Sequence, residues 1–235
     1  LVDALVARGY QVRVLDLFDR RFDRLPQGVE WIRSDINTEY AIRESVVGMD
    51  TVFHLAWTSI HETATRDPLM DMTTNLQPSV RLMDECCHAG VQRFVFLSSA
   101  GTVYGRARYL PVDEDHPTDP ISAYGVTKLA VEKYLHMYRH LYGLDYAVLR
   151  PSVPYGPGQD PRRRQGAISG FLYRLATGLV ATQQYEAGLA AARESDQILD
   201  RVGAGGASHT RWLAQQEIVR ALIGLKRWQE ADASY

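Results

Sequence analysis

The segment ISAYGVTKLAVEK places a tyrosine at position 124 and a lysine four residues later, at position 128. Residues four apart lie on one face of a helix, so the ammonium group of Lys128 can approach the phenol of Tyr124. A nearby positive charge favours the phenolate and lowers the pKa of a tyrosine from about 10 toward neutrality. Such a tyrosine can take a proton from an alcohol while hydride leaves the same carbon. The alternative is a surface tyrosine packed on a lysine stem.

The composition is that of an ordinary globular protein. The chain has 235 residues, of which 46% are hydrophobic and 23% are charged, and its net charge is −2. This charge balance does not favour nucleic acid or an anionic membrane as a partner. No apolar run approaches the roughly 20 residues that cross a bilayer. The chain has no metal-site spacing of histidines, and we interpret the neighbours Cys86 and Cys87 as free thiols in a reducing cytoplasm.

Strands and helices are predicted to alternate over residues 1–150. Such alternation implies crossover connections and a parallel sheet covered by helices on both faces. Ligands of these folds bind beyond the carboxyl ends of the strands. The expected strands are 11–17, 29–33, 51–56, 93–99 and 145–150, and the expected helices are 1–9, 38–48, 69–89 and 122–142.

An aspartate, Asp16, ends the first of these strands. Its carboxylate can accept hydrogen bonds from both hydroxyls of an adenosine ribose and would repel a 2′-phosphate, which favours NAD over NADP. Arg20 and Arg21 follow closely and weaken that preference, and a helix-capping aspartate is the structural alternative. Asp35 and Ile36 follow the next strand, where they could flank an adenine.

Several further motifs occur in order along the chain. They are MDTVFHLAW (49–57), MTTNL with Asn75, RFVFLSSAGTVYG (93–105), LPVDEDHPTDPISAYGVTKLAVEKYL (110–135) and LRPSVPYGPGQ (149–159). Together they resemble the extended short-chain dehydrogenases/reductases, specifically the nucleotide-sugar epimerase/dehydratase group. The first resembles the D-x-V-x-H-x-A-A strand of that group, and the last its R-P-x-N-V-Y-G-P-G-Q. The resemblance covers residues 1 to about 178.

The resemblance implies roles for particular residues. Tyr124 would be the proton acceptor, and Lys128 would bind the nicotinamide ribose and tune the tyrosine. The Ser/Thr position of the family is Ala100 here, so Thr102 or Ser99 would supply the hydroxyl that polarises the substrate oxygen. The residues expected to line the NAD site are Asp16, Asp35, Ile36, Leu55, Ala56, Asn75, Ser98, Tyr124, Lys128 and Pro151.

The activity that the resemblance implies is that of a UDP-glucose 4-epimerase-like enzyme, which passes hydride to NAD from a carbon of a nucleotide sugar and returns it to the other face. A homodimer through helices 70–89 and 122–142 is also expected. Gly101 and Thr102 stand where dehydratases of the family have an Asp-Glu pair, which disfavours dehydration, and Val153 replaces an asparagine near the substrate diphosphate. An NAD(P)-dependent sugar-nucleotide reductase or dehydratase stays an alternative.

The opening strand and G-x-x-G-x-x-G loop of the family have no counterpart in the sequence, so weak or no NAD binding is expected. The predicted fold of residues 1–178 is therefore a Rossmann-like, doubly wound parallel sheet that lacks its first strand.

Residues 179–235 predict an α-helical hairpin tail. Tyr185, Gly188 and Ala190 recur as Trp228, Ala231 and Ala233, which resembles a tetratricopeptide-type repeat; a plain helical hairpin is the alternative. A truncated, inactive fusion that binds a protein partner through this tail is the remaining hypothesis.

Overall fold

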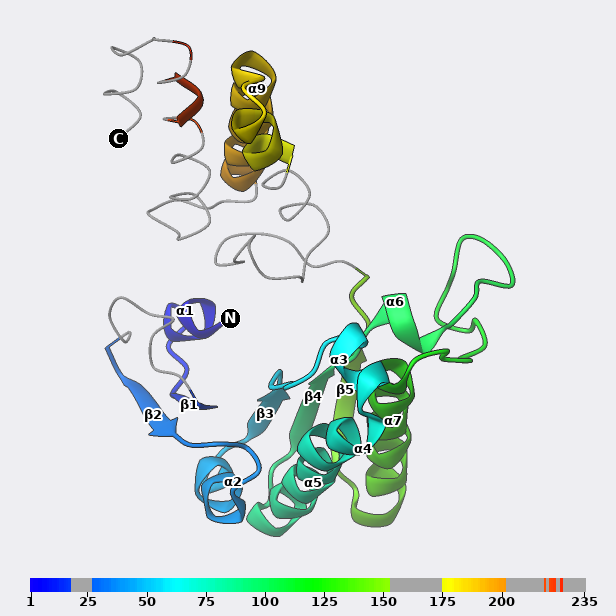
Figure 1. The fold of residues 1–235 in the computed structure, drawn as a ribbon. Helices are drawn as coiled ribbons and strands as arrows, with labels where there is room; N and C mark the ends of the chain where they lie inside the picture. Colours follow the sequence, from blue (N-terminus) through cyan, green and yellow to red (C-terminus); the bar gives the residue numbers. More distant parts are fainter. Residues whose placement is uncertain (18–26, 153–174, 202–217, 219, 223–224, 226–235) are drawn as a thin grey trace. The chain divides into compact units, whose positions relative to one another are not determined.

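The computed structural model describes residues 1–17, 27–152, 175–201, 218, 220–222 and 225 (Figure 1). The chain divides into two units, Leu1–Ser152 and Val153–Tyr235. Val153 and the predicted repeat partners Trp228, Ala231 and Ala233 lie outside the described residues. The division predicted between residues 178 and 179 stays a prediction.

The strands of the first unit form two parallel sheets. β1 (Val12–Asp16) pairs with β2 (Val29–Arg33) in one sheet. β3 (Thr51–His54) pairs with β4 (Arg93–Leu97), and β4 pairs with β5 (Asp145–Leu149), in the other. The predicted strands are confirmed, and within each sheet all strands end at the same edge. The segments that follow the strands therefore gather at these carboxyl ends.

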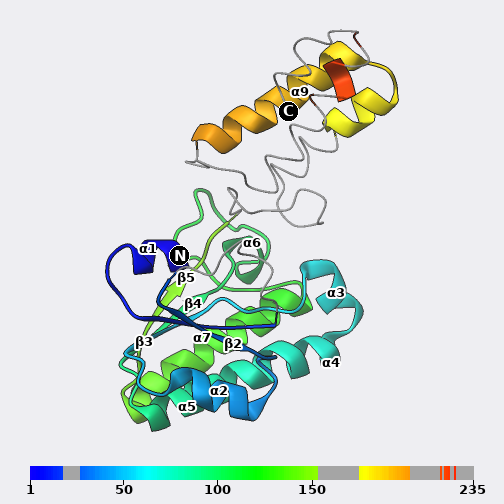
Figure 2. The same ribbon diagram turned by 90° about the vertical axis from the view of Figure 1, so that its left-hand side faces the viewer.

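A buried core lies between the larger sheet and three helices. Phe94 and Phe96 of β4 are fully buried and pack with apolar side chains from all three helices. α5 and α7 lie side by side along the strands (Figures 1 and 2). The parallel sheets with packed helices confirm the Rossmann-like prediction. The helices of this layer are α2 (Glu39–Val46), α5 (Gln77–Ala89) and α7 (Ala123–Tyr142); α1 (Val2–Val6) packs on β1.

The two cysteines of α5 are free, as predicted. Burial raises the pKa of the Cys86 thiol to about 12. The thiol therefore stays protonated and serves as a small apolar side chain of the core.

The helix predicted over 69–89 contains a π-helical turn. α4 (Pro68–Asp71) runs into η1 (Met72–Leu76), where the N–H of Gln77 bonds to the carbonyl of Met72, and then into α5. Pro78 explains the change, because it has no N–H to donate and its ring crowds the carbonyl four residues earlier. A π turn re-routes hydrogen bonds around such a position. It also places Asn75 inside the structure, 3% exposed.

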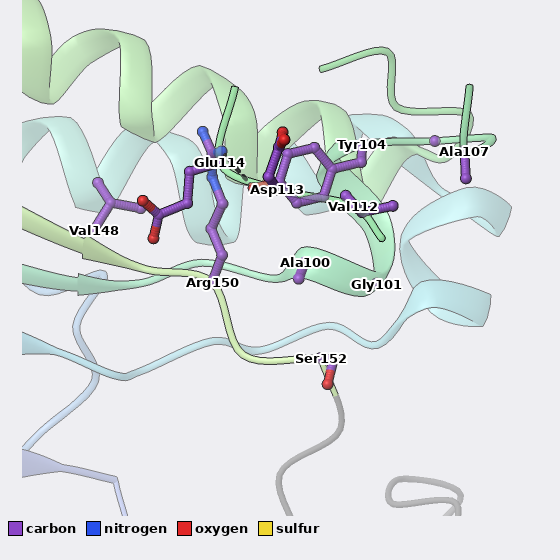
Figure 3. Close-up of a pocket in the computed structure, with 11 residues that line it drawn as sticks. Ala100, Gly101, Tyr104, Ala107, Val112, Asp113, Glu114, Val148, Arg150 and Ser152 are labelled. Carbon is purple, nitrogen blue, oxygen red and sulfur yellow. Dashed lines mark hydrogen bonds between the residues drawn. The ribbon is translucent and has the colours of Figure 1, made fainter. Parts of the chain in front are cut away.

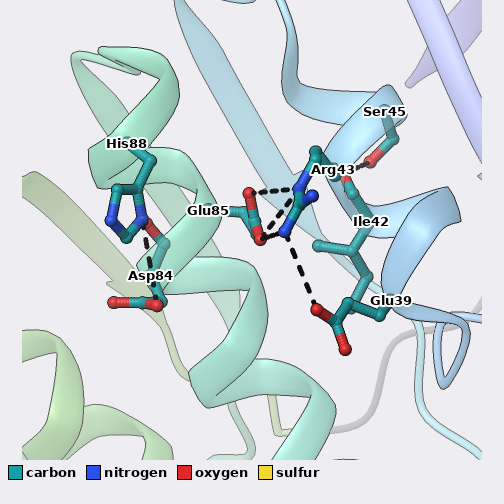
Figure 4. A network of polar contacts seen from close by, with 7 residues as sticks. All are labelled: Glu39, Ile42, Arg43, Ser45, Asp84, Glu85 and His88. Carbon is teal, nitrogen blue, oxygen red and sulfur yellow. Dashed lines mark hydrogen bonds and ion pairs between the residues drawn. The ribbon is translucent and has the colours of Figure 1, made fainter.

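An ion pair on the surface joins α2 to α5 (Figure 4). The guanidinium of Arg43 lies 3.2 Å from Glu85 and 3.7 Å from Glu39. The Arg43 side chain is 62% exposed, so water and salt screen the pair. The packing of α2 on α5 therefore depends on its buried residues Ile42 and Val46.

A buried histidine ends β3. His54 is 3% exposed, its Nε2 lies 2.7 Å from the hydroxyl of Ser79, and its ring stacks on Phe96. The Ser79 hydroxyl donates to the carbonyl of Asn75 at 2.5 Å, so Nε2 of the neutral ring is the donor to Ser79. Burial, and then the charge of Lys128, lowers the pKa of His54 to about 3.

This histidine predicts a loss of stability in acid. Between about pH 6.5 and pH 3, His54 is protonated in the unfolded chain but stays neutral in the folded protein. Because the unfolded state binds the extra proton, acid favours unfolding in this range. We expect the free energy of unfolding to fall by about 1.4 kcal/mol per pH unit in this window from His54 alone. Urea unfolding at a series of pH values measures it. His54→Gln should reduce the slope, His61→Gln at an exposed site should not, and equal slopes in all three proteins would contradict the assignment.

The described part of the second unit is helical. Residues 175–181 form a helix that a turn at Gln183, with φ of 61°, separates from α9 (Tyr185–Arg201). A Cβ on Gly188 would lie 2.8 Å from Val180, so this glycine lets the two helices cross closely. The predicted helix starting at 179 is thus broken, because residue 183 adopts a left-handed conformation. The tetratricopeptide likeness stays a prediction.

Within the described residues, no helix is long and apolar enough to span a bilayer. The cytoplasmic location stays a prediction.

Candidate active site

The first two turns of α7 carry the tyrosine and the lysine. Ser122 caps the helix by accepting a hydrogen bond from the N–H of Gly125 at 3.2 Å. Tyr124 therefore lies in the first turn and Lys128 in the second, on the same side of the helix. A Cβ on Gly125 would lie 2.6 Å from the carbonyl oxygen of Thr102. The missing side chain thus lets α6 (Ala100–Val103) pack against the turn that holds Tyr124.

The electrostatics of Tyr124 differ from the prediction. Burial, and then the charge of Asp71, raises the pKa of Tyr124 above its usual 10. The predicted lowering by Lys128 is wrong for this arrangement, because the lysine Nζ lies 5.7 Å from the centroid of the tyrosine ring and is bonded elsewhere. At neutral pH the phenol therefore keeps its proton.

Lys128 points toward the end of β4. Its Nζ donates to the carbonyl of Leu97 at 2.8 Å and lies 3.6 Å from the centroid of the Trp57 ring. The side chain is 4% exposed. Burial lowers the pKa of Lys128 to about 7, and the charges of Asp71 and Glu132 oppose this shift. A lysine with such a pKa can change its charge near neutral pH.

The two candidate hydroxyls lie at the start of α6. Among the described residues, the Thr102 hydroxyl makes one long hydrogen bond, 3.5 Å, to the carbonyl of Ser99. Ser99 occupies the N-cap position, but its side chain does not cap the helix. The N–H of Ala100 donates to the carbonyl of Pro151 at 3.0 Å and so joins α6 to the chain after β5. Ser99 and Thr102 both stay candidates for polarising a substrate oxygen.

Asn75 is held within a buried polar network. Its amide oxygen accepts from the N–H of Thr58 at 2.8 Å, and its amide nitrogen donates to Asp71 at 2.9 Å and to Ser59 at 3.1 Å. The Ser59 hydroxyl also donates to Asp71, which is fully buried. The Asn75 side chain therefore positions the segment after β3, and its atoms are engaged by protein groups.

A second network joins β4, α7 and β5. Glu132 is 7% exposed and accepts from the Ser98 hydroxyl and, through both oxygens, from the Arg150 guanidinium. Arg150 also donates to the Tyr104 hydroxyl at 2.8 Å. The hydroxyl of Ser98, a predicted cofactor residue, therefore donates its hydrogen bond to Glu132. This network holds α7 on the ends of two strands.

Three predicted cofactor residues lie at or just after the strand ends of the smaller sheet: Asp16, Asp35 and Ile36. Asp16 is the last residue of β1. Asp35 accepts from the N–H and the side-chain amide of Asn37, both at 2.8 Å, and this local turn is the structural role of its carboxylate. Ile36 is partly buried and packs against the core.

Leu55, Ala56 and Pro151 follow strands of the larger sheet. Leu55 and Ala56 lie exposed directly after β3, and Pro151 is half-buried after β5. They share the carboxyl edge of this sheet with Ser98, whereas Asp16 and Asp35 lie at the edge of the other sheet. Both edges carry candidate cofactor residues, as a nucleotide site of this fold requires.

A pocket of about 650 Å³ opens beside α6 (Figure 3). Arg150 and Tyr104 line it together with Asp113 and Glu114 of the following loop. Ala100 and Gly101 of α6 contribute to its wall, but Tyr124 and Lys128 do not. The pocket is therefore separate from the tyrosine and lysine pair.

The model of the NAD-dependent epimerase/dehydratase family matches residues 1–195. The chain belongs to this family. The match extends past residue 178, where the sequence resemblance was expected to end.

Two relatives of this family are UDP-glucose 4-epimerases by name. A putative enzyme of Methanocaldococcus jannaschii is 33% identical over 74% of this chain and 58% of its own length. That of Mycolicibacterium smegmatis is 36% identical over 76% of this chain and 59% of its own length. The chain thus spans less than two thirds of these relatives.

Solved structures of the family have a fold similar to that of this chain. UDP-glucose 4-epimerase of Thermotoga maritima with UDP-glucose superposes with a TM-score of 0.70 at 33% identity, over 75% of this chain and 59% of that one. The enzyme of Thermus thermophilus in complex with NAD gives 0.69 at 32% identity, over 75% and 58%.

Two residues that surround the pair were not predicted. Trp57 stands at the last alanine of the family's D-x-V-x-H-x-A-A motif, so the departure was visible in the sequence, but its contact with Lys128 was not. Asp71 acts on Tyr124 and Lys128 from α4, and no local pattern marks it.

Proposed function

We propose that this chain carries the catalytic tyrosine and lysine of an NAD-dependent nucleotide-sugar epimerase that acts as UDP-glucose 4-epimerase does. The observation that carries the proposal is the placement of Tyr124 and Lys128 in the first two turns of α7, beside the end of β4, in a member of this family. The names of the relatives support the substrate class, and the Thermus thermophilus complex supports NAD.

The donor set fits NAD at the strand ends. Asp16 would accept from the adenosine ribose, and the exposed backbone of Leu55 and Ala56 would lie along the dinucleotide. Lys128 would donate to the nicotinamide ribose, because its ammonium has three donors and a single acceptor, Leu97, among the described residues. When bound, NAD supplies a reversible acceptor for hydride.

Tyr124 would exchange the proton of the reacting sugar hydroxyl. Its phenolate accepts that proton as hydride leaves the same carbon, and the phenol returns it when hydride comes back to the other face. Lys128, moved toward the phenol, would favour the phenolate and lower the raised pKa of Tyr124. Ser99 or Thr102 would donate to the sugar oxygen, on which negative charge develops.

The same residues disfavour dehydration. Removal of water from a sugar needs a general acid and a general base besides the tyrosine. Gly101 and Thr102, at the start of α6, supply no carboxyl group. Epimerisation needs none, so it is the activity that these side chains support best.

We also propose that a second copy of the chain packs on α7. Val126, Tyr134, Met137 and Leu141 recur at helical spacing and are 53%, 38%, 38% and 58% exposed. Such a stripe is typical of a helix that buries one more face in a partner. A tail that recruits another protein stays a separate prediction.

Calorimetric titration of NAD into this chain tests the cofactor site. We expect weak binding by the parent protein, because the glycine-rich loop has no counterpart in this sequence, and a further loss of about 10- to 100-fold in affinity for Asp16→Ala, because two hydrogen bonds to a charged group are removed. Asp3→Ala, at an exposed position of α1, is the matched control and should bind as the parent does. Absence of binding by a folded parent protein would overturn the proposal.

A further inference from the structure

Aromatic rings enclose the Lys128 ammonium group. The Nζ lies 3.6 Å from the centroid of the Trp57 ring and 4.8 Å from that of Phe96. A buried ammonium group needs acceptors or aromatic faces in place of water. In the described part of the chain, Leu97 provides the hydrogen-bond acceptor at 2.8 Å. The rings therefore add to the stabilisation that Leu97 and the charges of Asp71 and Glu132 provide.

The Trp57 ring contacts both the lysine and the tyrosine side chains. Besides covering the ammonium, its ring meets Tyr124 edge to face, with the centroids 5.9 Å apart. Its indole N–H is buried and has no hydrogen-bond partner among the residues that the structure describes. Packing and the contact with the cation hold the ring, and no hydrogen bond of the described residues fixes its orientation.

We propose that Trp57 is a positioning residue that holds the Lys128 ammonium on the Leu97 carbonyl, away from Tyr124, until bound cofactor displaces the indole. The proposal rests on the proposed function, in which Lys128 must reach the nicotinamide ribose and Tyr124. The arrangement described here is then the resting one, and the indole competes with the ribose for the ammonium.

The groups around Lys128 determine in which direction its pKa should change when the Trp57 indole is removed. Asp71 of α4 and Glu132 of α7 favour its charged form, and burial opposes them more strongly. His54 of β3 is neutral above about pH 3, and Tyr124 is protonated, so neither adds charge at neutral pH. Removal of the indole admits water, so the pKa of Lys128 should rise from about 7 toward 10.5.

The Trp57 and Phe96 rings around the Lys128 ammonium group are called the cage below. Amine acylation followed by peptide mass spectrometry tests whether this cage shields Lys128 in the cofactor-free chain, over pH 6 to 10. The protein has three lysines, Lys128, Lys133 and Lys226, and Lys133 is an exposed reference on the same helix. In the parent protein we expect Lys128 to react at least about tenfold more slowly than Lys133 at high pH. Equal rates for these two lysines would overturn the proposal without any variant.

Two substitutions of Trp57 distinguish complete loss of the aromatic ring from its replacement by a smaller ring. Trp57→Ala should raise the plateau rate of Lys128 by at least about fivefold and move its midpoint to higher pH, because reagent and water enter. Trp57→Phe keeps a ring over the ammonium and should stay within about twofold of the parent. An unchanged Lys128 rate and midpoint in a folded Trp57→Ala protein would contradict the proposal, with circular dichroism as the control for folding.

NAD titration distinguishes this inference from the proposed function. If the indole competes with the ribose, Trp57→Ala should bind NAD about two- to tenfold more tightly than the parent. Faster labelling of Lys128 in Trp57→Ala without NAD binding by either protein would support the cage and overturn the cofactor assignment. Weaker NAD binding by a folded Trp57→Ala would overturn the competition.

Discussion

Replacement of Tyr124 by phenylalanine should lower turnover of UDP-galactose in the presence of NAD by about 100- to 10,000-fold, the usual contribution of a positioned acid/base group. The substitution removes one hydroxyl and keeps the ring, so the edge-to-face contact with Trp57 is kept. NAD affinity should therefore change little. A coupled assay that detects UDP-glucose measures the rate, and calorimetry measures the affinity.

The control for this substitution lies on the same helix. Tyr142→Phe changes a tyrosine that is 61% exposed at the end of α7, outside the stripe proposed to bind a second copy, and it should leave the rate unchanged. Turnover by Tyr124→Phe at the parent rate would refute the proton-transfer role. A loss of rate accompanied by an equal loss of NAD binding would place Tyr124 in the cofactor site and not in the chemical step.

The pH dependence of turnover follows from the same group. The base must be a phenolate, and burial raises the pKa of Tyr124 above 10 in the resting arrangement. The rate should therefore rise with pH across the neutral range. If the ammonium of Lys128 approaches the phenol after Trp57 turns away, the midpoint of this rise should lie below 10.

The sequence was sufficient for the order of the five strands and of α2, α5 and α7, and for the placement of the pair. The pattern of apolar segments, with glycines at the ends of helices, predicts the strands and α7. The spacing of Tyr124 and Lys128 places both on one helical face. These features are local, so the sequence can show them. The π turn before Pro78 differs from the predicted regular helix, although its signal is local: a proline within a helical pattern cannot donate the hydrogen bond of a regular turn.

The direction of the Tyr124 pKa could not be predicted from spacing. The long stem of Lys128 can reach either the phenol or the Leu97 carbonyl, and tertiary packing of Trp57 decides between them. Asn75 shows the same limit. A position predicted to face the cofactor has its amide bonded to Thr58, Ser59 and Asp71, which come together only in the fold.

The Glu132–Arg150 pair should be the most sensitive point of stability at the site. Glu132 is 7% exposed and Arg150 23%, and the guanidinium lies 2.5 Å from the carboxylate. Arg150→Met would leave a buried carboxylate with Ser98 as its remaining hydrogen-bond donor among the described side chains. We expect it to lower the free energy of unfolding by about 3 to 5 kcal/mol, measured by urea unfolding.

The same strands supply the matched control for this pair. Arg93 at the start of β4 pairs with Asp145 at the start of β5, at 2.8 Å, with side chains 60% and 41% exposed. Water screens that pair, so Arg93→Met should cost only a small fraction of the loss in Arg150→Met. Arg150→Met combined with Glu132→Leu should recover much of the loss, because no charge is then buried alone. Equal losses from Arg93→Met and Arg150→Met would show that burial does not set the energy of the Glu132–Arg150 pair.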